Sequence, residues 1–156
     1  MLKINLIAIG DIKEKYLTDA INEYSKRISR FAELKIVELK ENNPKSSSEK
    51  DIELALEKDA INIEKNIKGY PICLDIDSPQ FSSPQFAQKI KNLAIHNSEI
   101  SFIIGASNGI SQRIKSICKE RISFSKMTFP HQLMRVIFLE QLYRAFAINN
   151  NIAYHK

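Results

Sequence analysis

The amino-acid sequence predicts a single α/β domain with three layers and a mainly parallel sheet. Short runs rich in Ile and Leu alternate with amphipathic helical patterns along the whole chain, which is typical of repeated strand and helix units. A length of 156 residues, with 44% hydrophobic and 26% charged side chains, is ordinary for one globular domain. We therefore expect residues 1–156 to fold as one unit.

The spacing of apolar residues, and the glycines, prolines and polar loops between them, define the expected elements. Ser48, with Asp51 three residues later, predicts a capping box at the start of a long helix that ends before Gly69. Strands are expected at residues 3–9, 34–39, 70–76 and 100–104, and helices at 17–30, after Ser48, from Ser83 onward, at 110–121 and after Pro130. Ligands of such sheets bind beyond the carboxyl ends of the strands.

The helix after Pro130 is apolar on nearly every side, which is unusual in a domain of this size. A helix of this kind needs cover on more than one side, and a second subunit is one way to provide it. We therefore expect the helix from Leu133 to Ile148 to form part of a homodimer interface. Phe138 and Leu142 are the side chains expected to lie in that interface.

The start of the same helix is a candidate ligand site. Thr128 is placed to cap the helix, and Pro130 suits its first turn. The backbone N–H groups near His131 and Gln132 would then form a small anion-binding end.

The excess positive charge of the chain lies in its C-terminal third. Residues 111–156 hold eight Lys or Arg and two Glu, a net charge of +6, whereas the whole chain carries +5. Within this third, Arg135 and Arg144 interrupt the apolar helix, and each guanidinium must reach solvent, form an ion pair or face a phosphate. Glu140 lies four residues before Arg144, which favours an ordinary helical ion pair. The charge distribution makes RNA a reasonable partner.

Several other classes of function are not supported. The GASNG segment at residues 105–109 lacks both the dinucleotide-binding pattern and the P-loop pattern. Cys73 and Cys118 are isolated, and His96, His131 and His155 have no metal-ligand spacing, so we assign no disulfide and no metal. The N-terminal apolar run is too short for a signal peptide or a membrane span, so we expect a cytoplasmic protein with no membrane partner.

Six segments taken in order resemble one family from end to end. They are KINLIAIG, EKYLTDAINEYSKRI, CLDI, FIIGASNGI, SFSKMTFPHQLMRVIFLEQLYRAF and the terminal AYHK. They resemble the bacterial ribosomal RNA large subunit methyltransferase H family, which belongs to the SPOUT superfamily. The resemblance implies a C-terminal trefoil knot and a homodimer. It also implies S-adenosylmethionine-dependent methylation of N3 of a pseudouridine in 23S ribosomal RNA of the assembled ribosome.

The resemblance also implies which residues act. S-adenosylmethionine would lie against Leu74, Gly105 and the loop formed by Phe124, Ser125, Lys126, Met127, Thr128 and Phe129. Ala106 departs from the family, which usually has a second glycine there, and its methyl group would narrow the approach to the cofactor. The candidates that assist deprotonation of the imide are His131, Arg144, Tyr154 and His155, and the sequence does not divide the roles among them. The alternative is a non-catalytic RNA-binding or ribosome-binding module.

Overall fold

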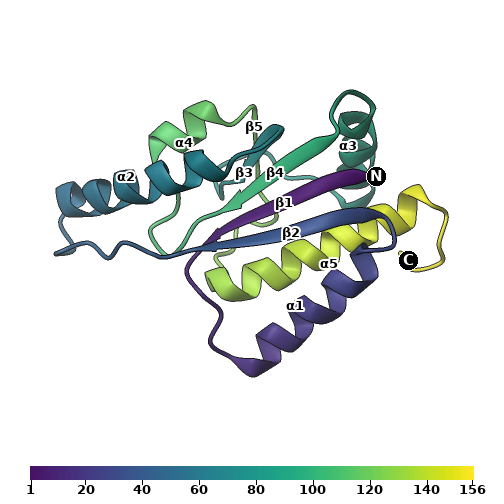
Figure 1. Ribbon diagram of the computed structural model, residues 1–156, viewed down its shortest axis with the longest axis horizontal. Coiled ribbons are helices and arrows are strands. Elements are labelled where there is room, and N and C mark those ends of the chain that lie inside the picture. Colours follow the sequence, from purple (N-terminus) through teal and green to yellow (C-terminus); the bar gives the residue numbers. More distant parts are fainter.

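A computed structural model describes residues 1–156 and contains one five-stranded sheet in the order β2-β1-β4-β3-β5 (Figure 1). The elements are β1 (Leu2–Ile9), α1 (Lys15–Ile28), β2 (Ala32–Leu39), α2 (Glu49–Asn66), β3 (Tyr70–Leu74), α3 (Ser83–His96), β4 (Glu99–Ile104), α4 (Gln112–Ile117), β5 (Glu120–Ile122) and α5 (His131–Asn149). Every pair of neighbouring strands is parallel. All carboxyl ends therefore meet at one edge of the sheet, as expected for the α/β class.

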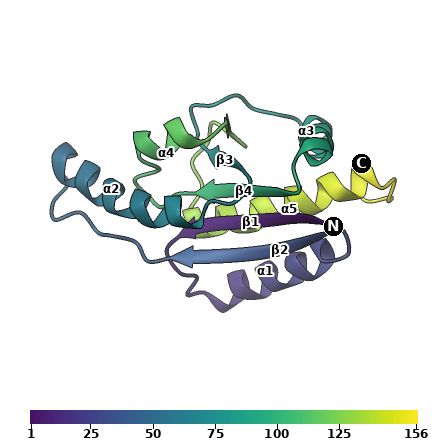
Figure 2. The same cartoon turned by 45° about the horizontal axis from the view of Figure 1, so that its top comes forward.

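The sheet is buried on both faces, which makes three layers. Successive side chains of a strand point to opposite faces, so Ile4 and Leu6 of β1 join one hydrophobic cluster while Ile7 and Ile9 join the other. The first cluster includes residues of α1, α3 and α5, and the second includes residues of α2 and α4. Figure 1 shows α1 and α5 on one side of the strands and α2 and α4 on the other, and Figure 2 shows the same molecule turned. The three-layer prediction is confirmed.

The predicted helix at residues 110–121 is shorter than expected and is followed by a strand. Residues 120–122 form β5, which pairs with β3 at the edge of the sheet. Glu120 of β5 accepts hydrogen bonds from Tyr70 at 3.2 Å and from Lys89 at 2.6 Å. A strand of three residues is too short to show an alternating pattern, and these partners lie at least 31 residues away along the chain.

The helix caps agree with the sequence in part. The Ser48 side chain accepts a hydrogen bond from the Asp51 N–H at 3.2 Å, as predicted. The reciprocal half of the capping box is absent, because the Asp51 carboxylate accepts a hydrogen bond from Ser46 Oγ at 2.6 Å instead. The prediction that Thr128 caps α5 is wrong: Pro130 itself occupies the N-cap position, which leaves Thr128 two residues outside the helix.

Helix α5 is covered mainly by its own chain. Phe138 and Leu142 are fully buried against the sheet and neighbouring helices, so the prediction that they lie in a dimer interface is wrong. A parallel sheet with α1 and α3 alongside surrounds more of the helix than the sequence pattern could show. Leu133 is 38% exposed and is the apolar side chain of α5 most open to solvent. The trefoil knot stays a prediction. No helix combines the length and hydropathy needed to cross a membrane.

Candidate functional site

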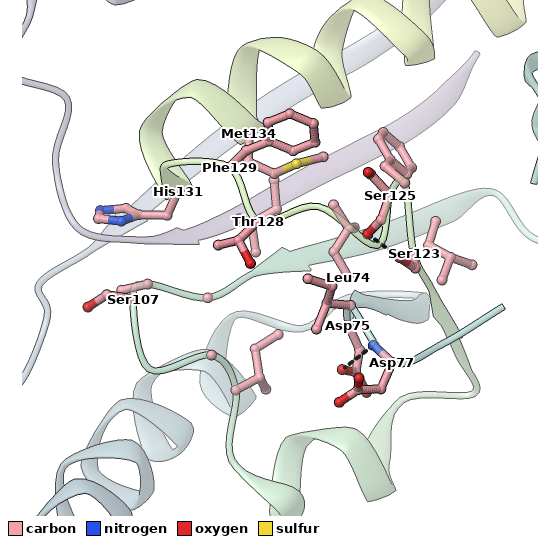
Figure 3. Close-up of a pocket in the computed structure, with 18 of the residues that line it drawn as sticks. Leu74, Asp75, Asp77, Ser107, Ser123, Ser125, Thr128, Phe129, His131 and Met134 are labelled. Atoms are coloured by element: carbon pink, nitrogen blue, oxygen red, sulfur yellow. Dashed lines mark hydrogen bonds between the residues drawn. The ribbon is translucent and has the colours of Figure 1, made fainter. Parts of the chain in front are cut away.

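A pocket of about 420 Å³ opens at the carboxyl ends of β3, β4 and β5 (Figure 3). Three loops and the start of α5 line it. They contribute residues 74–77, 104–110, 122–125 and 127–129, together with Lys115, His131 and Met134. The loops that follow three parallel strands have converged on one place, which is the position expected for a ligand site in an open α/β sheet.

The loop after β4 is a compact turn that requires glycine. A Cβ on Gly105 would collide with the Gly109 carbonyl oxygen, and Gly109 itself has a φ of +78°. The Gly109 N–H donates to the Ala106 carbonyl at 2.9 Å and closes the turn. The Ala106 side chain packs against the hydrophobic cluster under α2 and α4 while it also lines the pocket. The loop therefore accommodates alanine at this position.

The loop after β5 is held by an aromatic anchor and two hydrogen bonds. The Phe124 ring packs against Phe86 at 5.6 Å and Phe138 at 6.0 Å between ring centroids. Ser123 Oγ donates to the Ser125 carbonyl at 3.0 Å, and Ser125 Oγ accepts from the Met127 N–H at 2.9 Å.

Seven of the eight residues expected to contact the cofactor line the pocket, and one does not. Those that line it are Leu74, Gly105, Phe124, Ser125, Met127, Thr128 and Phe129. Lys126 is exposed and lies outside the lining.

Acidic side chains at the end of β3 were not singled out by the sequence pattern. The Asp75 side chain is only 8% exposed, and its carboxylate lies 3.5 Å from Lys115 Nζ and 3.9 Å from Arg121 Nη1. Figure 3 shows Asp75 and Asp77 across the pocket from Thr128 and Phe129, and the Asp77 N–H donates to Asp75 Oδ1 at 3.3 Å. Their position directly after a buried strand is the signal that could have indicated them.

His131 stands at the rim of the pocket, in the first turn of α5. Its Nε2 lies 3.6 Å from the point where a Cβ on Gly10 would sit, so the ring covers the carboxyl end of β1. One turn later, the Arg135 guanidinium is buried and donates to Glu38 at 2.8 Å and to the Ile9 carbonyl at 2.9 Å. Burial lowers the pKa of Arg135, and the hydrogen bond to Glu38 opposes that shift. Arg135 thus pairs a buried guanidinium with a Glu38 side chain that is 46% exposed.

The other three catalytic candidates form a separate group at the far end of α5. Arg144 Nη2 donates to Glu140 at 2.6 Å, which confirms the expected helical ion pair. The same guanidinium lies 4.7 Å from the centroid of the Tyr154 ring, and its Nη1 lies 3.1 Å from His155 Nδ1. The Tyr154 hydroxyl donates to Glu140 at 3.0 Å. Burial and this hydrogen bond raise the pKa of Tyr154 to about 12.

The two groups of candidates are far apart within one chain. Thirteen residues separate His131 from Arg144 on one continuous helix, a distance of about 20 Å at 1.5 Å per residue. A single chain therefore presents a pocket with His131 at one end of α5 and an Arg144, Tyr154 and His155 group at the other. The structure brings no three His, Cys, Asp or Glu side chains together as a possible metal site.

The fold and the pocket define a parallel α/β protein with a ligand site at the carboxyl edge of its sheet. Comparisons with known proteins identify the family of α/β proteins to which the chain belongs. A family profile described as "Predicted SPOUT methyltransferase" matches residues 2–155. A protein of Haemophilus influenzae described as "a probable methylase family protein" has a similar fold, with a TM-score of 0.55 and 16% identity over 98% of this chain and 70% of that one.

Two curated relatives are each named ribosomal RNA large subunit methyltransferase H. The protein of Fusobacterium nucleatum is 47% identical and that of Clostridium acetobutylicum is 44% identical, each over 99% of this chain and 100% of the relative. The chain belongs to this family, within the SPOUT methyltransferases.

Proposed function

We propose that the chain is an S-adenosylmethionine-dependent methyltransferase that modifies N3 of a pseudouridine in 23S ribosomal RNA of the assembled ribosome. The observation that carries the proposal is the pocket at the carboxyl ends of β3, β4 and β5. Its lining includes Leu74, Gly105 and most of the loop from 124 to 129, the three segments in which the family resemblance implies the cofactor site. The relatives' names support a ribosomal RNA substrate.

The residues present fit the proposed cofactor. The volume of about 420 Å³ falls within the range of ordinary ligand pockets. Apolar side chains such as Leu74, Ile110 and Phe129 suit an adenine ring, and Ser123, Ser125 and backbone groups of the glycine loop offer polar partners at its edges. Asp77 provides negative charge at the end of the pocket next to β3, which suits a ligand with a sulfonium and an ammonium group, whereas the Asp75 carboxylate is balanced by Lys115 and Arg121.

When bound, S-adenosylmethionine would supply an electrophilic sulfonium methyl group. The ring imide nitrogen of the substrate is a poor nucleophile until its proton leaves, so the protein has to align the two partners and favour the imide anion. Arg144 and His155 are suited to the second task, and Tyr154 carries an aromatic ring that can stack on an extruded base. His131 is the candidate nearest the pocket.

A homodimer would bring these two groups together. An isologous dimer in which two α5 helices cross antiparallel near Ile137 would place the start of one helix beside the end of the other. His131 precedes Ile137 by six residues and Tyr143 follows it by six, so His131 of one chain would lie close to Arg144 of the second. The partly exposed apolar side chains Leu133, Val136 and Ile137 support this face of α5 as the contact.

Calorimetric titration of the purified protein with S-adenosylmethionine tests the proposal directly. We expect saturable binding by a dimer, and loss of binding when bulk is added to the pocket wall in a Leu74→Trp variant. Ribosomes lacking the modification should then gain one methyl group at the pseudouridine, located by mass mapping of nuclease fragments. A folded dimer without cofactor affinity would favour a non-catalytic RNA-binding module. A methyl group on another nucleotide would show that the substrate is not the proposed pseudouridine.

A further inference from the structure

The contact between Arg144 and His155 fixes which nitrogen of the imidazole carries the proton. A guanidinium has N–H donors and no acceptor, so the 3.1 Å contact of Arg144 Nη1 with His155 Nδ1 requires Nδ1 to accept. A neutral imidazole with an accepting Nδ1 carries its proton on Nε2. His155 therefore presents an N–H donor on the side of the ring that faces away from Arg144.

Glu140 holds the arginine that makes this contact. Its Oε1 accepts hydrogen bonds from Arg144 Nε at 3.1 Å and from Arg144 Nη2 at 2.6 Å. The remaining nitrogen of the guanidinium, Nη1, is directed at His155. The Arg144 and Glu140 side chains are 23% and 19% exposed. Glu140 also accepts from the Tyr154 hydroxyl at 3.0 Å, so that phenol is committed as a donor.

At this end of α5, Arg144 and Tyr154 act as donors and Glu140 accepts from both. The charged and titratable groups around His155 come from three segments. Arg144 and Glu140 belong to α5, Tyr154 and Lys156 to the tail, and Tyr24 and Arg27 of α1 lie close to Tyr154. The Tyr154 hydroxyl is protonated at neutral pH, as any phenol with a pKa of 10.0 or higher is. Adding a proton to His155 Nδ1 would break its hydrogen bond and place a second cation beside Arg144. His155 could take a proton on Nδ1 only by giving up its contact with Arg144.

We propose, on the basis of the function proposed above, that His155 acts as an Nε2–H donor to the imide anion and takes no proton from the substrate, with Glu140 as the positioning residue that orients Arg144. The N3–H bond of the base breaks and its electron pair stays on the ring, delocalised over N3 and the flanking carbonyl oxygens. The proton passes to water or hydroxide. Arg144 and His155 stabilise the resulting negative charge, which makes N3 nucleophilic.

The tautomer can be tested without any turnover. Long-range ¹H–¹⁵N correlation spectra of ¹⁵N-histidine-labelled dimer distinguish the two neutral forms, and His155→Gln assigns the signal. We expect the Nε2–H form in the parent protein and a mixture of forms in Glu140→Gln, which loosens Arg144. A matched control is Asp19→Asn, which removes the carboxylate of another i,i+4 pair (Lys15–Asp19) on α1 and should leave the spectrum unchanged. An Nδ1–H form in the parent would overturn the proposal.

Replacement by glutamine separates donor from base in the reaction. Glutamine keeps an N–H donor but cannot take a proton, so single-turnover methyl transfer by His155→Gln should stay within about tenfold of the parent, whereas His155→Ala should lose about a hundredfold. Equal losses in both variants, together with disappearance of a pH inflection near the ordinary imidazole value of about 6.5, would show that His155 is a base. Persistence of the parent pH profile in His155→Gln would support the donor role.

Glu140→Gln tests the positioning role of Glu140, because it should lower kcat without changing the affinity for the cofactor. We expect kcat to fall about tenfold or more, while the calorimetric affinity for S-adenosylmethionine and the melting temperature stay at parent values. An unchanged kcat would refute the role of Glu140. If the parent protein itself binds no cofactor and modifies no ribosome, the proposed function fails instead, and the tautomer measurement still reports on the Arg144–His155 contact.

Discussion

Replacing Arg135 with methionine should destabilise the domain. Arg135 is the largest fully buried side chain in the structure, and its guanidinium is hydrogen-bonded there. It donates to Glu38 at 2.8 Å and to the carbonyl oxygens of Ile9 at 2.9 Å and Gly10 at 2.5 Å. These contacts tie the second turn of α5 to the carboxyl ends of β1 and β2. Methionine has a similar length and no donor, so Arg135→Met removes the hydrogen bonds while largely keeping the packing.

The expected loss can be worked out from the partners left behind. Each buried carbonyl without its donor costs about 1–3 kcal/mol. The Glu38 side chain is 46% exposed, so its unpaired carboxylate remains solvated and adds about 1 kcal/mol at most. Relief of the buried charge works in the opposite direction, because desolvation of an ion costs several kcal/mol. The two carbonyls and the carboxylate together account for a loss of about 2–7 kcal/mol, and relief of the buried charge offsets several kcal/mol of it, so we expect a net loss of about 1–3 kcal/mol in the free energy of unfolding.

Urea denaturation followed by circular dichroism, at fixed protein concentration, measures this difference. The matched control is Arg113→Met, which removes an arginine that pairs with Glu64 at 2.6 Å on the surface, with 46% and 43% of the side chains exposed. That control should change stability by less than about 1 kcal/mol. If Arg135→Met is as stable as the control, the carbonyl contacts contribute no net stability and the estimate is refuted.

Four further predictions follow from the site. Deleting residues 154–156 should leave the fold and S-adenosylmethionine binding nearly intact while methyl transfer to ribosomes falls by orders of magnitude; transfer at the parent rate would exclude a catalytic tail. Leu133→Lys should yield folded monomer by sedimentation, whereas Phe138→Asp should lower the melting temperature sharply, since Phe138 is fully buried within its own chain; a dimer that survives Leu133→Lys would argue against this face. Absorbance titration should give Tyr154 a pKa of about 12, and a lower value in Glu140→Gln because burial still acts but the carboxylate no longer does. Since the pKa is raised on folding, the associated stability is complete below the ordinary value of 10.0 and is lost as the pH rises towards 12. Binding to ribosomes should weaken steeply with salt, measured by cosedimentation, because of the basic C-terminal third; salt-insensitive binding would contradict an electrostatic contribution.

The elements that the sequence predicted well are those with long, regular patterns. The strand at residues 3–9 and the helix at residues 17–30 differ from β1 and α1 by no more than two residues at either end. The wrong predictions concern a short strand and the start of a helix. The strand β5 is three residues long, and Thr128 was assigned a capping role that depends on the backbone path through Pro130. Short elements and exact helix starts depend on contacts outside the window in which a pattern can be read.

The sequence alone determined the alternation of strands and helices, the concentration of positive charge and the motifs that carry the family resemblance, because these are properties of order and spacing along the chain. Only the tertiary structure decided which side chains meet. It buried Arg135 against the end of β1, placed Phe138 inside the domain, and brought His155 to Arg144 while keeping Arg144 about 20 Å from His131. The order of the strands in the sheet and the side chains surrounding a helix are set by packing between distant segments, which no local pattern encodes.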